Sequence, residues 1–366
     1  MTIVFAGGGT GGHLYPAIAI AGAMGERGAS AEFVGSADRL EAKIVPSCGY
    51  PLHAIASRPF GRRLSIDLVR TVASNVAGTL QSLRLLSRLR PDAVVATGGY
   101  VCFPVVLAAR ILRTLRLFGG PIALLEPNAR PGLTNRLLSP LVDEVWGAFD
   151  DAHFKKKFVR TGVPIRASLH SLPSREDALA RLGLSPRRKT LFAMGGSQGA
   201  RSINDALIGV FESGSFPTGW QLVHATGESD YDRVRAAIGA DDAAVLPYVN
   251  DVADAYAAAD LVLARAGAST LGELAAIGKP AVLVPYPYAA GAHQEANAQR
   301  FAATGAAVVV ADRDLAAGRL ADALAEATAP QRLAELEAAA ARLRATDPLA
   351  VIVARVDALV RRTKAR

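Results

Sequence analysis

Residues 6–17 read AGGGTGGHLYPA, and this glycine-rich stretch decides how the first half of the chain folds. It follows the apolar run of residues 2–6, which predicts a strand, and precedes a segment whose apolar spacing predicts a helix over about 13–27. Five glycines around one threonine leave backbone N–H groups uncovered where the strand passes into the helix. Because a helix N-terminus carries roughly half a positive charge, this loop is suited to bind a diphosphate or another anion.

The same opening occurs a second time. Residues 5–24 align without a gap to residues 192–211, and both segments contain Phe-Ala, two adjacent glycines, a hydroxyl residue and a further glycine. This alternation of strands and helices is typical of βαβ units, which form a parallel sheet with helices on both faces. The other strand-like runs lie at 31–36, 92–99, 122–128 and 143–149 in the first half and at 221–227, 243–249, 261–267 and 280–287 in the second.

These features predict an α/β chain with two domains, which the length of 366 residues also favours. We place the domains at residues 1–164 and 165–345 and expect each to be a Rossmann-like, doubly wound parallel sheet. Such a sheet binds its ligand beyond the carboxyl ends of its strands, so the two glycine loops are expected to face an interdomain cleft. The last segment breaks at Asp347-Pro348, and a terminal helix over about 346–366 is expected to pack back on the first domain.

Composition narrows the class of partner. The chain has 41 basic and 33 acidic residues and a formal net charge of +8, which favours anionic partners. Nucleic acid is not expected, because the basic residues are dispersed among apolar ones without aromatic stacking positions. No stretch reaches the roughly 18 apolar residues that span a bilayer, and the first strand does not resemble a signal peptide, so we expect a cytosolic protein. Cys48 and Cys102 lack metal-ligand spacing and are expected to be buried thiols.

The first loop satisfies G-x-G-x-x-G over residues 7–12, so a dinucleotide site has to be considered. Such a site needs an acidic residue at the end of the second strand, whereas this strand ends in Gly35-Ser36 and Asp38 follows only later. No Gly-Lys-Ser/Thr sequence closes either loop, which excludes a Walker P-loop. Backbone amides and helix N-termini can stabilise a departing diphosphate by themselves, so we predict no cofactor and no obligatory protein-bound metal.

Several motifs resemble, in order and spacing, the MurG family of bacterial cell-wall glycosyltransferases over about residues 3–310. They are GGTGGHLYPA (8–17), GGYVCFPVVLAA (98–109), EPNARPGLTNR (126–136), TGVPIR (161–166), GGSQGARSIN (195–204) and, most specifically, the segment 264–298. The resemblance implies the GT-B architecture and an inverting hexosyltransferase. It would move N-acetylglucosamine from UDP-GlcNAc to the muramyl 4-hydroxyl of lipid I, forming lipid II in peptidoglycan synthesis. It also implies a peripheral location at the cytoplasmic face of the inner membrane, with cell-wall synthesis and division proteins as further partners.

The resemblance implies a UDP-GlcNAc site in the second domain. Glu273 matches the carboxylate that accepts hydrogen bonds from the ribose hydroxyls, although alone it also fits an ordinary acid near a helix start. Val249 matches the position whose backbone recognises uracil, and Ser197 matches a diphosphate contact. The remaining matches are Ala268, Ser269, Thr270, Leu271 and Gly272 in the turn beneath the diphosphate, Arg166 of the UDP site, and Gln294 and Asn297, which would read the sugar hydroxyls but alone also fit solvated surface.

The acceptor is expected in the first domain. The resemblance implies that Thr10, Gly11 and Gly12 approach the diphosphates and that Asn128 reaches the donor sugar across the cleft. Tyr100 is expected near the acceptor pocket, and a half-buried aromatic ring at a strand end is the alternative interpretation.

His13 is the candidate general base for the acceptor hydroxyl. A helix N-terminus disfavours the imidazolium cation, which keeps the ring a neutral base. The alternative is a histidine that positions the loop or donates to a phosphate. In that case Glu126 is the next carboxylate to test as the catalytic base.

Four positions depart from the usual family pattern. Val163 stands where an asparagine is common, and Cys102 stands where a serine is common; Leu125 and Pro127 flank Glu126 where His and Gln are frequent. Val163 and Cys102 are expected near the cleft, which puts in doubt any hydrogen bond that the usual side chain makes there.

A polyprenyl acceptor requires contact with a bilayer. Residues 60–90 mix a stripe of leucine, isoleucine and valine with arginines, and residues 109–118 repeat the pattern. A basic amphipathic surface binds anionic headgroups, so an anionic membrane surface is an expected partner. Sheet-covering helices with arginine exteriors are the alternative.

Other functions remain open on the sequence. A GT-B transferase that uses a UDP-sugar with another lipid or small-molecule acceptor would share the glycine loops and Glu273. A non-catalytic nucleotide-sugar-binding scaffold would keep the donor residues and lose the base. A Rossmann dehydrogenase is a more distant alternative, which an absence of nicotinamide binding would exclude.

Overall fold

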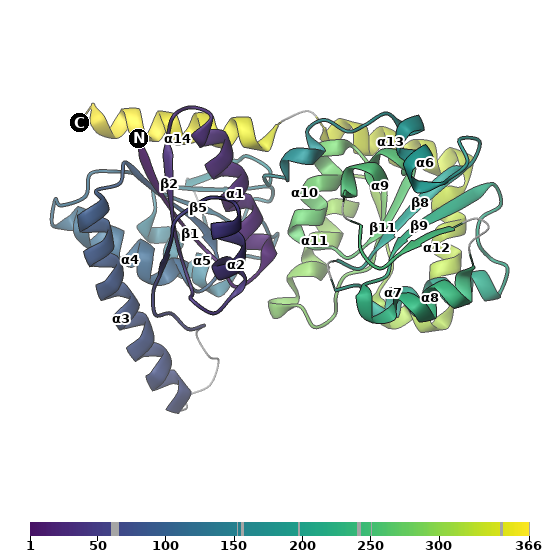
Figure 1. Ribbon diagram of the computed structural model, residues 1–366, viewed down its shortest axis with the longest axis horizontal. Coiled ribbons are helices and arrows are strands. Elements are labelled where there is room, and N and C mark those ends of the chain that lie inside the picture. Colours follow the sequence, from purple (N-terminus) through teal and green to yellow (C-terminus); the bar gives the residue numbers. More distant parts are fainter. Residues whose placement is uncertain are drawn as a thin grey trace. The chain divides into compact units, whose positions relative to one another are not determined.

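Two parallel β-sheets, each covered by helices on both faces, organise the chain in the computed structural model (Figure 1). The structure describes residues 1–59, 66–151, 153–154, 157–196, 198–239, 243–249, 251–344 and 347–365. Unit 1 comprises residues 1–166 and 347–366, and unit 2 comprises residues 167–346. The predicted α/β class with two doubly wound parallel sheets is therefore confirmed.

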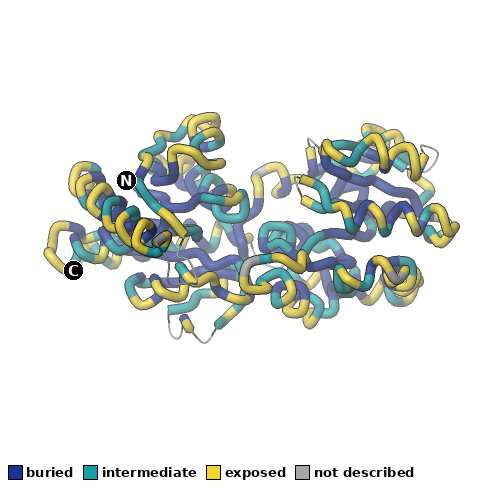
Figure 2. The backbone as a smooth tube through the Cα atoms, turned by 90° about the horizontal axis from the view of Figure 1, so that it is seen from below, coloured by how far each residue is buried: buried dark blue, intermediate teal, exposed yellow. Residues whose placement is uncertain are grey.

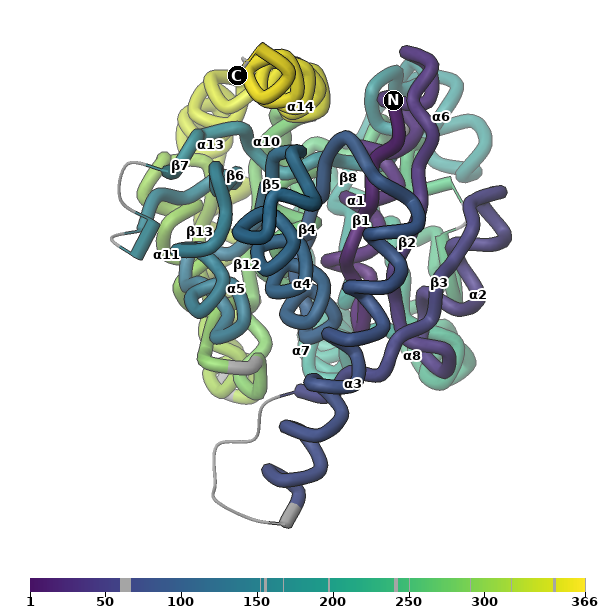
Figure 3. The backbone as a smooth tube through the Cα atoms, turned by 90° about the vertical axis from the view of Figure 1, so that its left-hand side faces the viewer, coloured from purple at the N-terminus to yellow at the C-terminus, as the bar shows by residue number. Residues whose placement is uncertain are grey.

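The sheet of unit 1 has seven parallel strands in the order β3-β2-β1-β4-β5-β6-β7, which Figure 3 shows from right to left. The order reverses direction on either side of β1, the topological switch point where doubly wound sheets place their ligands. The strands are β1 Thr2–Gly7, β2 Ser30–Gly35, β3 Leu52–Ala54, β4 Ala93–Gly98, β5 Ile122–Leu125, β6 Glu144–Gly147 and β7 Phe158–Arg160.

Alternate residues of β1 enter two separate cores. Ile3 and Phe5 face α1, α2 and α14, whereas Val4 and Ala6 face α3, α4 and α5. This follows from the two-residue period of a strand, and both faces are apolar because helices cover both. The helices are α1 Gly11–Gly25, α2 Leu40–Ser47, α3 Ile66–Leu89, α4 Cys102–Thr114, α5 Leu133–Leu138, the 3₁₀ turn Ser139–Leu141 and α14 Pro348–Lys364.

The C-terminal helix α14 packs against α1 in unit 1 (Figure 1). Asp347 caps it by accepting a hydrogen bond from the Leu349 N–H at 2.9 Å, and Pro348 occupies its first turn, where no N–H is needed. Its apolar face joins the β1 core, and Arg27 donates to Asp357 at 2.9 Å at the rim. The sequence break at Asp347-Pro348 is thus a helix start.

Unit 2 repeats this plan with six parallel strands in the order β10-β9-β8-β11-β12-β13. The strands are β8 Lys189–Met194, β9 Trp220–Ala225, β10 Ala243–Leu246, β11 Leu261–Ala264, β12 Ala281–Leu283 and β13 Ala307–Val309. The helices are α6 Arg175–Leu182, α7 Arg201–Glu212, α8 Tyr231–Ile238, α9 Val252–Ala258, α10 Ala268–Ile277, α11 His293–Ala302, α12 Arg319–Thr328 and α13 Pro330–Leu343, with 3₁₀ turns at Ala167–Leu169, Glu228–Asp230, Ala290–Ala292 and Asp312–Ala317. The central strands of both units are buried, and exposed residues recur along the helices (Figure 2).

The sequence did not predict three short strands, and the predicted burial of one cysteine is wrong. β3, β7 and β13 have three residues each, which is too short for a recognisable alternation. Cys48 is exposed, contrary to the prediction of a buried thiol, because it follows the last residue of α2, where the chain turns at the surface. Cys102 is buried, as predicted.

Candidate functional site

A buried carboxylate holds the first glycine loop from behind. Glu41, in the first turn of α2, is fully buried, and its two oxygens accept from the Gly9 N–H at 3.0 Å and the Ser36 N–H at 2.9 Å. A Cβ on Gly8 would lie 2.3 Å from Glu41 Oε1, so glycine is required there by close packing. Glu41 therefore fixes the ends of β1 and β2. The sequence analysis missed it, although an acid in the first turn after a predicted strand was a visible signal.

The start of α1 has features that favour the binding of an anion. Thr10 is exposed at the N-cap, makes no side-chain capping bond, and is followed by a first turn without any acidic residue. Gly11 and Gly12 place their N–H groups in that turn, where a helix has no partners of its own for them. These three residues lie together, as expected from the sequence, at the carboxyl end of the central strand.

His13 lies against the turn that follows β4. Its Nδ1 donates to the Thr97 carbonyl oxygen at 3.1 Å, so Nδ1 carries a proton. Gly98, at φ +106°, allows this approach, because a Cβ there would lie 2.4 Å from His13 Nδ1. The ring is thus oriented by the backbone of a neighbouring strand, as a general base requires.

Cys102 anchors the same turn. The Gly98 N–H donates to its sulfur at 3.2 Å, and the thiol lies 3.1 Å from the Ala6 and Gly98 carbonyl oxygens. Burial raises the pKa of the Cys102 thiol to about 12, so it stays protonated and can donate. Sulfur therefore makes hydrogen bonds at this position, where a serine is common in the family. Val163, the other departure expected near the cleft, is buried.

Glu126 organises the loop after β5. It is 1% exposed, and its oxygens accept from the N–H groups of Asn128 and Gly132 and from the side-chain amides of Asn128 and Asn135, at 2.9–3.1 Å. Burial raises the pKa of Glu126, and these donors act against the rise. Four donors on one buried carboxylate favour a role in shaping the loop that carries Asn128 over proton abstraction.

The second glycine loop is supported by Asn204 and His224, and the Asn204 amide also donates to the Asp230 carboxylate at 2.7 Å. Ser197 lies outside the described residues. Gly199, at φ +74°, packs so tightly that a Cβ would lie 1.9 Å from the Thr226 carbonyl oxygen, to which the Asn204 amide donates at 3.0 Å. Asn204 Oδ1 accepts from His224 Nε2 at 3.0 Å, and His224 is fully buried. Burial lowers the pKa of His224 to about 4, so this imidazole is neutral.

The first turns of α10 gather the residues expected around the diphosphate and ribose. Ala268, Leu271 and Glu273 are buried, whereas Ser269, Thr270 and Gly272 are partly exposed, and the first turn holds no acid. Glu273 is 5% exposed and accepts from the Tyr256 hydroxyl at 2.8 Å, a partner that the sequence did not reveal. Ser269, one turn earlier, has a buried hydroxyl oxygen without a hydrogen-bond partner among the described residues, and a ligand hydroxyl or phosphate would satisfy it.

The other residues expected to bind the donor substrate differ in burial and in their contacts. Asn297 is fully buried and its amide donates to the Ala266 carbonyl oxygen at 3.1 Å, so the solvated-surface interpretation is wrong for it. Gln294 is partly exposed and accepts from the Tyr286 N–H at 3.0 Å, and Val249 is partly exposed after β10. Arg166, expected at the UDP site, belongs to unit 1, where its guanidinium lies 5.9 Å from the centre of the Tyr15 ring.

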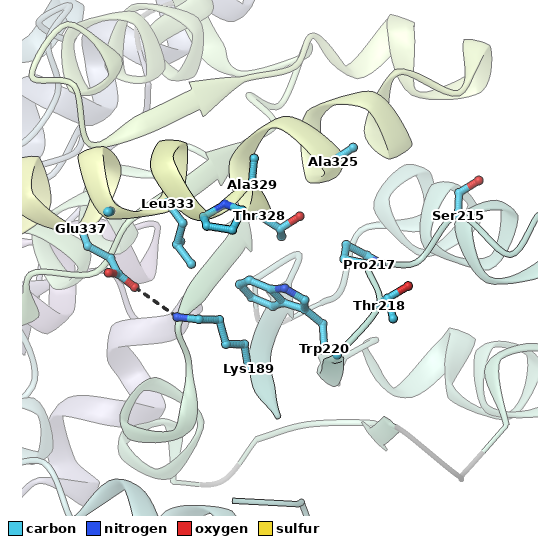
Figure 4. Close-up of a pocket in the computed structure, with 13 residues that line it drawn as sticks. Lys189, Ser215, Pro217, Thr218, Trp220, Ala325, Thr328, Ala329, Leu333 and Glu337 are labelled. Carbon is cyan, nitrogen blue, oxygen red and sulfur yellow. Dashed lines mark ion pairs between the residues drawn. The ribbon is translucent and has the colours of Figure 1, made fainter. Parts of the chain in front are cut away.

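A cavity of about 660 Å³ in unit 2 does not belong to this site. Lys189 and Trp220, at the amino ends of β8 and β9, line it, whereas the glycine loop follows the carboxyl end of β8. Figure 4 shows Lys189 directed toward Glu337, with which it forms an ion pair at 3.8 Å. The cavity therefore lies at the amino ends of the strands, whereas doubly wound sheets bind ligands beyond the carboxyl ends.

Comparisons with known proteins identify the family of the chain. The family models described as glycosyltransferase family 28 N-terminal and C-terminal domains match residues 3–146 and 190–352. Two relatives, from Halothermothrix orenii and Desulforudis audaxviator, are named UDP-N-acetylglucosamine–N-acetylmuramyl-(pentapeptide) pyrophosphoryl-undecaprenol N-acetylglucosamine transferase. Each is 41% identical, and they cover 87% and 96% of this chain and 88% and 98% of their own lengths.

Solved structures show the same fold. MurG of Acinetobacter baumannii superposes with a TM-score of 0.78 at 27% identity, over 97% of this chain and 99% of its own. A calicheamicin glycosyltransferase, 17% identical over 99% of this chain and 98% of its own, reaches 0.69 and shares the fold alone. The chain therefore belongs to the MurG family, within glycosyltransferase family 28.

Proposed function

We propose that this chain transfers N-acetylglucosamine from UDP-GlcNAc to the muramyl 4-hydroxyl of undecaprenyl-diphospho-MurNAc-pentapeptide, with inversion at the anomeric carbon. The observation that carries the proposal is 41% identity, over 96% of the chain, to a relative named for this transfer. The product is the disaccharide lipid of peptidoglycan synthesis, and the second product is UDP.

The donor is proposed to bind unit 2. Glu273, held by Tyr256, accepts from the ribose hydroxyls, and the first turn of α10 receives the diphosphate with Ser269 as an additional donor. Negative charge grows on the diphosphate as the glycosidic bond breaks, and a helix N-terminus stabilises it without reorganisation. Asn297 acts through the Ala266 carbonyl oxygen by shaping the loop before α10, and Gln294 is left to read the sugar hydroxyls.

The acceptor is proposed to bind unit 1. Its diphosphate approaches Thr10, Gly11 and Gly12, and His13 Nε2 takes the proton from the 4-hydroxyl. The oxygen then attacks the anomeric carbon on the face opposite the departing UDP, which inverts the centre. The Thr97 carbonyl oxygen continues to accept from Nδ1–H and stabilises the imidazolium that forms.

Membrane docking is proposed for the outer face of α3. Val69, Val72, Val76 and Leu80 are exposed at helical spacing along one face, and Leu115 and Leu117 are exposed after α4, which packs against α3. Arg70 and Arg116 lie beside them, as expected of a surface that meets anionic headgroups. Residues 60–65 of the predicted basic stretch lie outside the described residues. Among the described helices, none is long and apolar enough to cross a bilayer. A peripheral location at the cytoplasmic face is proposed.

One assay tests the function. Purified protein is incubated with labelled UDP-GlcNAc and a short-chain analogue of the acceptor lipid, and we expect labelled disaccharide lipid together with an equal amount of UDP. Release of UDP without disaccharide lipid, or no reaction, would contradict the proposal. Flotation with liposomes tests the location: binding that is indifferent to anionic lipid and salt would rule out α3 as an electrostatic anchor.

A further inference from the structure

A second cavity, of about 480 Å³, adjoins the first glycine loop in unit 1. It lies among the carboxyl ends of β2 and β3 and the first turns of α3, and Tyr100 forms part of its wall. The Tyr100 ring lies 3.2 Å from where a Cβ on Gly9 would be, and its hydroxyl lies 3.4 Å from Ser36 Oγ. One aromatic side chain therefore separates this cavity from the loop that is proposed to receive the acceptor diphosphate.

The lining of the cavity carries two guanidinium groups, of Arg58 and Arg39, and one carboxylate, of Asp38. Arg58 lines it, is exposed, and its guanidinium has no ion pair with any residue that the structure describes. Arg39 also lines it and meets only Asp38, at 3.9 Å, with both side chains mostly exposed. An exposed ion pair at that distance contributes little, so both guanidinium groups can bind an oxyanion.

The position of Arg58 is fixed by its backbone. The Arg58 N–H donates to Asn75 Oδ1 at 3.2 Å, and the Asn75 amide donates to the Arg58 carbonyl oxygen at 3.1 Å. Asn75 is 4% exposed on α3, and Gly78 on the same helix lets Ala56 approach, since a Cβ there would lie 1.9 Å from the Ala56 carbonyl oxygen. The adjacent Ser57 has a buried hydroxyl oxygen without a partner in the described parts of the chain. The wall thus presents the Arg58 side chain from a backbone that Asn75 holds in place, beside a buried hydroxyl without a partner among the described residues.

We infer that this cavity, here called the Arg58 cavity, binds the carboxylate-bearing peptide of the acceptor. The inference rests on the proposed function, in which the acceptor carries a pentapeptide on the muramyl sugar. The acceptor diphosphate is matched by backbone N–H groups at the start of α1, which leaves the side-chain cations of the cavity for a different anion on the same molecule. A peptide ends in a carboxylate, five extended residues reach about 17 Å, and a guanidinium fork fits a carboxylate with two parallel hydrogen bonds.

The test compares two acceptors and two variants. One acceptor has a peptide with free carboxylates, and in the other every peptide carboxylate is amidated. Arg58→Gln removes one of the two cavity cations, and Arg361→Gln removes an equal charge from an exposed position on α14, outside the cavity lining and the proposed membrane surface. We expect Arg58→Gln to raise KM for the carboxylate acceptor about tenfold with kcat unchanged, and to change KM for the amidated acceptor less than twofold. Arg361→Gln should leave KM for both acceptors unchanged, and neither variant should change KM for UDP-GlcNAc.

Two results would overturn the inference. An equal rise in KM for both acceptors would assign Arg58 to the diphosphate or another common group, and no rise for either would remove it from binding. The same acceptors are titrated calorimetrically against wild-type protein and Arg58→Gln without donor sugar, which reports the peptide contribution independently of turnover. A protein that prefers the carboxylate acceptor through Arg58 but forms no disaccharide lipid would refute the proposed function and leave the cavity assignment standing.

Discussion

The two glycine loops of the chain share a backbone plan but differ in what supports them. Each follows the strand at which the order of its sheet reverses, β1 in unit 1 and β8 in unit 2, and each opens a helix. Behind the first loop lies the buried carboxylate of Glu41, which accepts from the Gly9 N–H. Behind the second lie the neutral side chains of Asn204 and His224.

The two loops therefore share a topology but differ in the side chains around them. The glycines set how closely each loop can pack, and this requirement is met against Glu41 in unit 1 and against Thr226 in unit 2. In the gapless alignment His13 corresponds to Ala200, so only the first loop carries an imidazole at its helix start. We therefore propose that both helix starts bind anions and that only the first is equipped for proton transfer.

The substitution with the largest expected effect tests whether the first loop carries the general base. His13→Ala should lower kcat by about 10²- to 10⁴-fold, the usual contribution of a general base, with little change in KM for UDP-GlcNAc. Steady-state kinetics with the short-chain acceptor measures it, and circular dichroism checks the fold. A loss of less than tenfold in a folded variant would show that His13 is not the general base and that neither loop carries one. Glu126 would then be tested as the base.

Sequence patterns predicted those parts of the molecule that depend on neighbouring residues. Strands and glycine loops follow from local apolar runs and spacing, so the parallel sheets and both loops were predicted. The supports of the loops were not, because their partners lie far apart in the chain: Glu41 follows Gly9 by 32 residues and His224 follows Asn204 by 20. The pairing of Glu273 with Tyr256 was missed for the same reason.

The second prediction concerns His224, which supports the second glycine loop. The folded pKa of His224 is about 4, below the value of 6.5 for a free imidazole, so the unfolded chain binds a proton first as the pH falls. His224 therefore stabilises the folded state fully above pH 6.5, and this contribution is lost between pH 6.5 and 4, by roughly 3 kcal/mol in total. Urea unfolding at pH 7 and 4.5 measures it.

His224→Gln is the matched control, because its amide can still donate to Asn204 but does not titrate near neutral pH. The free energy of unfolding of the wild type should fall by about 2 kcal/mol more than that of His224→Gln between the two pH values. Parallel pH dependence of the two proteins would mean that the support of the second loop is solvated and charged, and the comparison between the loops would fail.

The third prediction concerns the charged support of unit 1. Glu41→Gln replaces one carboxylate oxygen with an amide that cannot accept, so a buried N–H of Gly9 or Ser36 loses its partner. The free energy of unfolding should fall by about 2 kcal/mol, and KM for the acceptor should rise while KM for UDP-GlcNAc stays constant. Asn204→Leu in unit 2 should show the reverse selectivity, which kinetics with each substrate varied in turn would reveal.

If Glu41→Gln raised both KM values equally, the two loops would act on one common ligand group rather than on separate substrates. If it raised neither, the Gly9 hydrogen bond would stabilise the fold without positioning the loop. Only a selective rise in the acceptor KM would support separate substrates for the two loops.

The smallest effect is expected at Thr10, the exposed residue that begins α1. Its hydroxyl makes no capping hydrogen bond, so Thr10→Ala should change the free energy of unfolding by less than about 0.5 kcal/mol, below the usual loss for a working cap. KM for the acceptor should still rise about threefold, since a hydroxyl beside a phosphate supplies one hydrogen bond. Thermal unfolding and acceptor titration, run on the same preparation, measure both. A variant that loses 1 kcal/mol or more of stability with unchanged KM would show that Thr10 caps its helix and leaves the anion to the backbone amides alone.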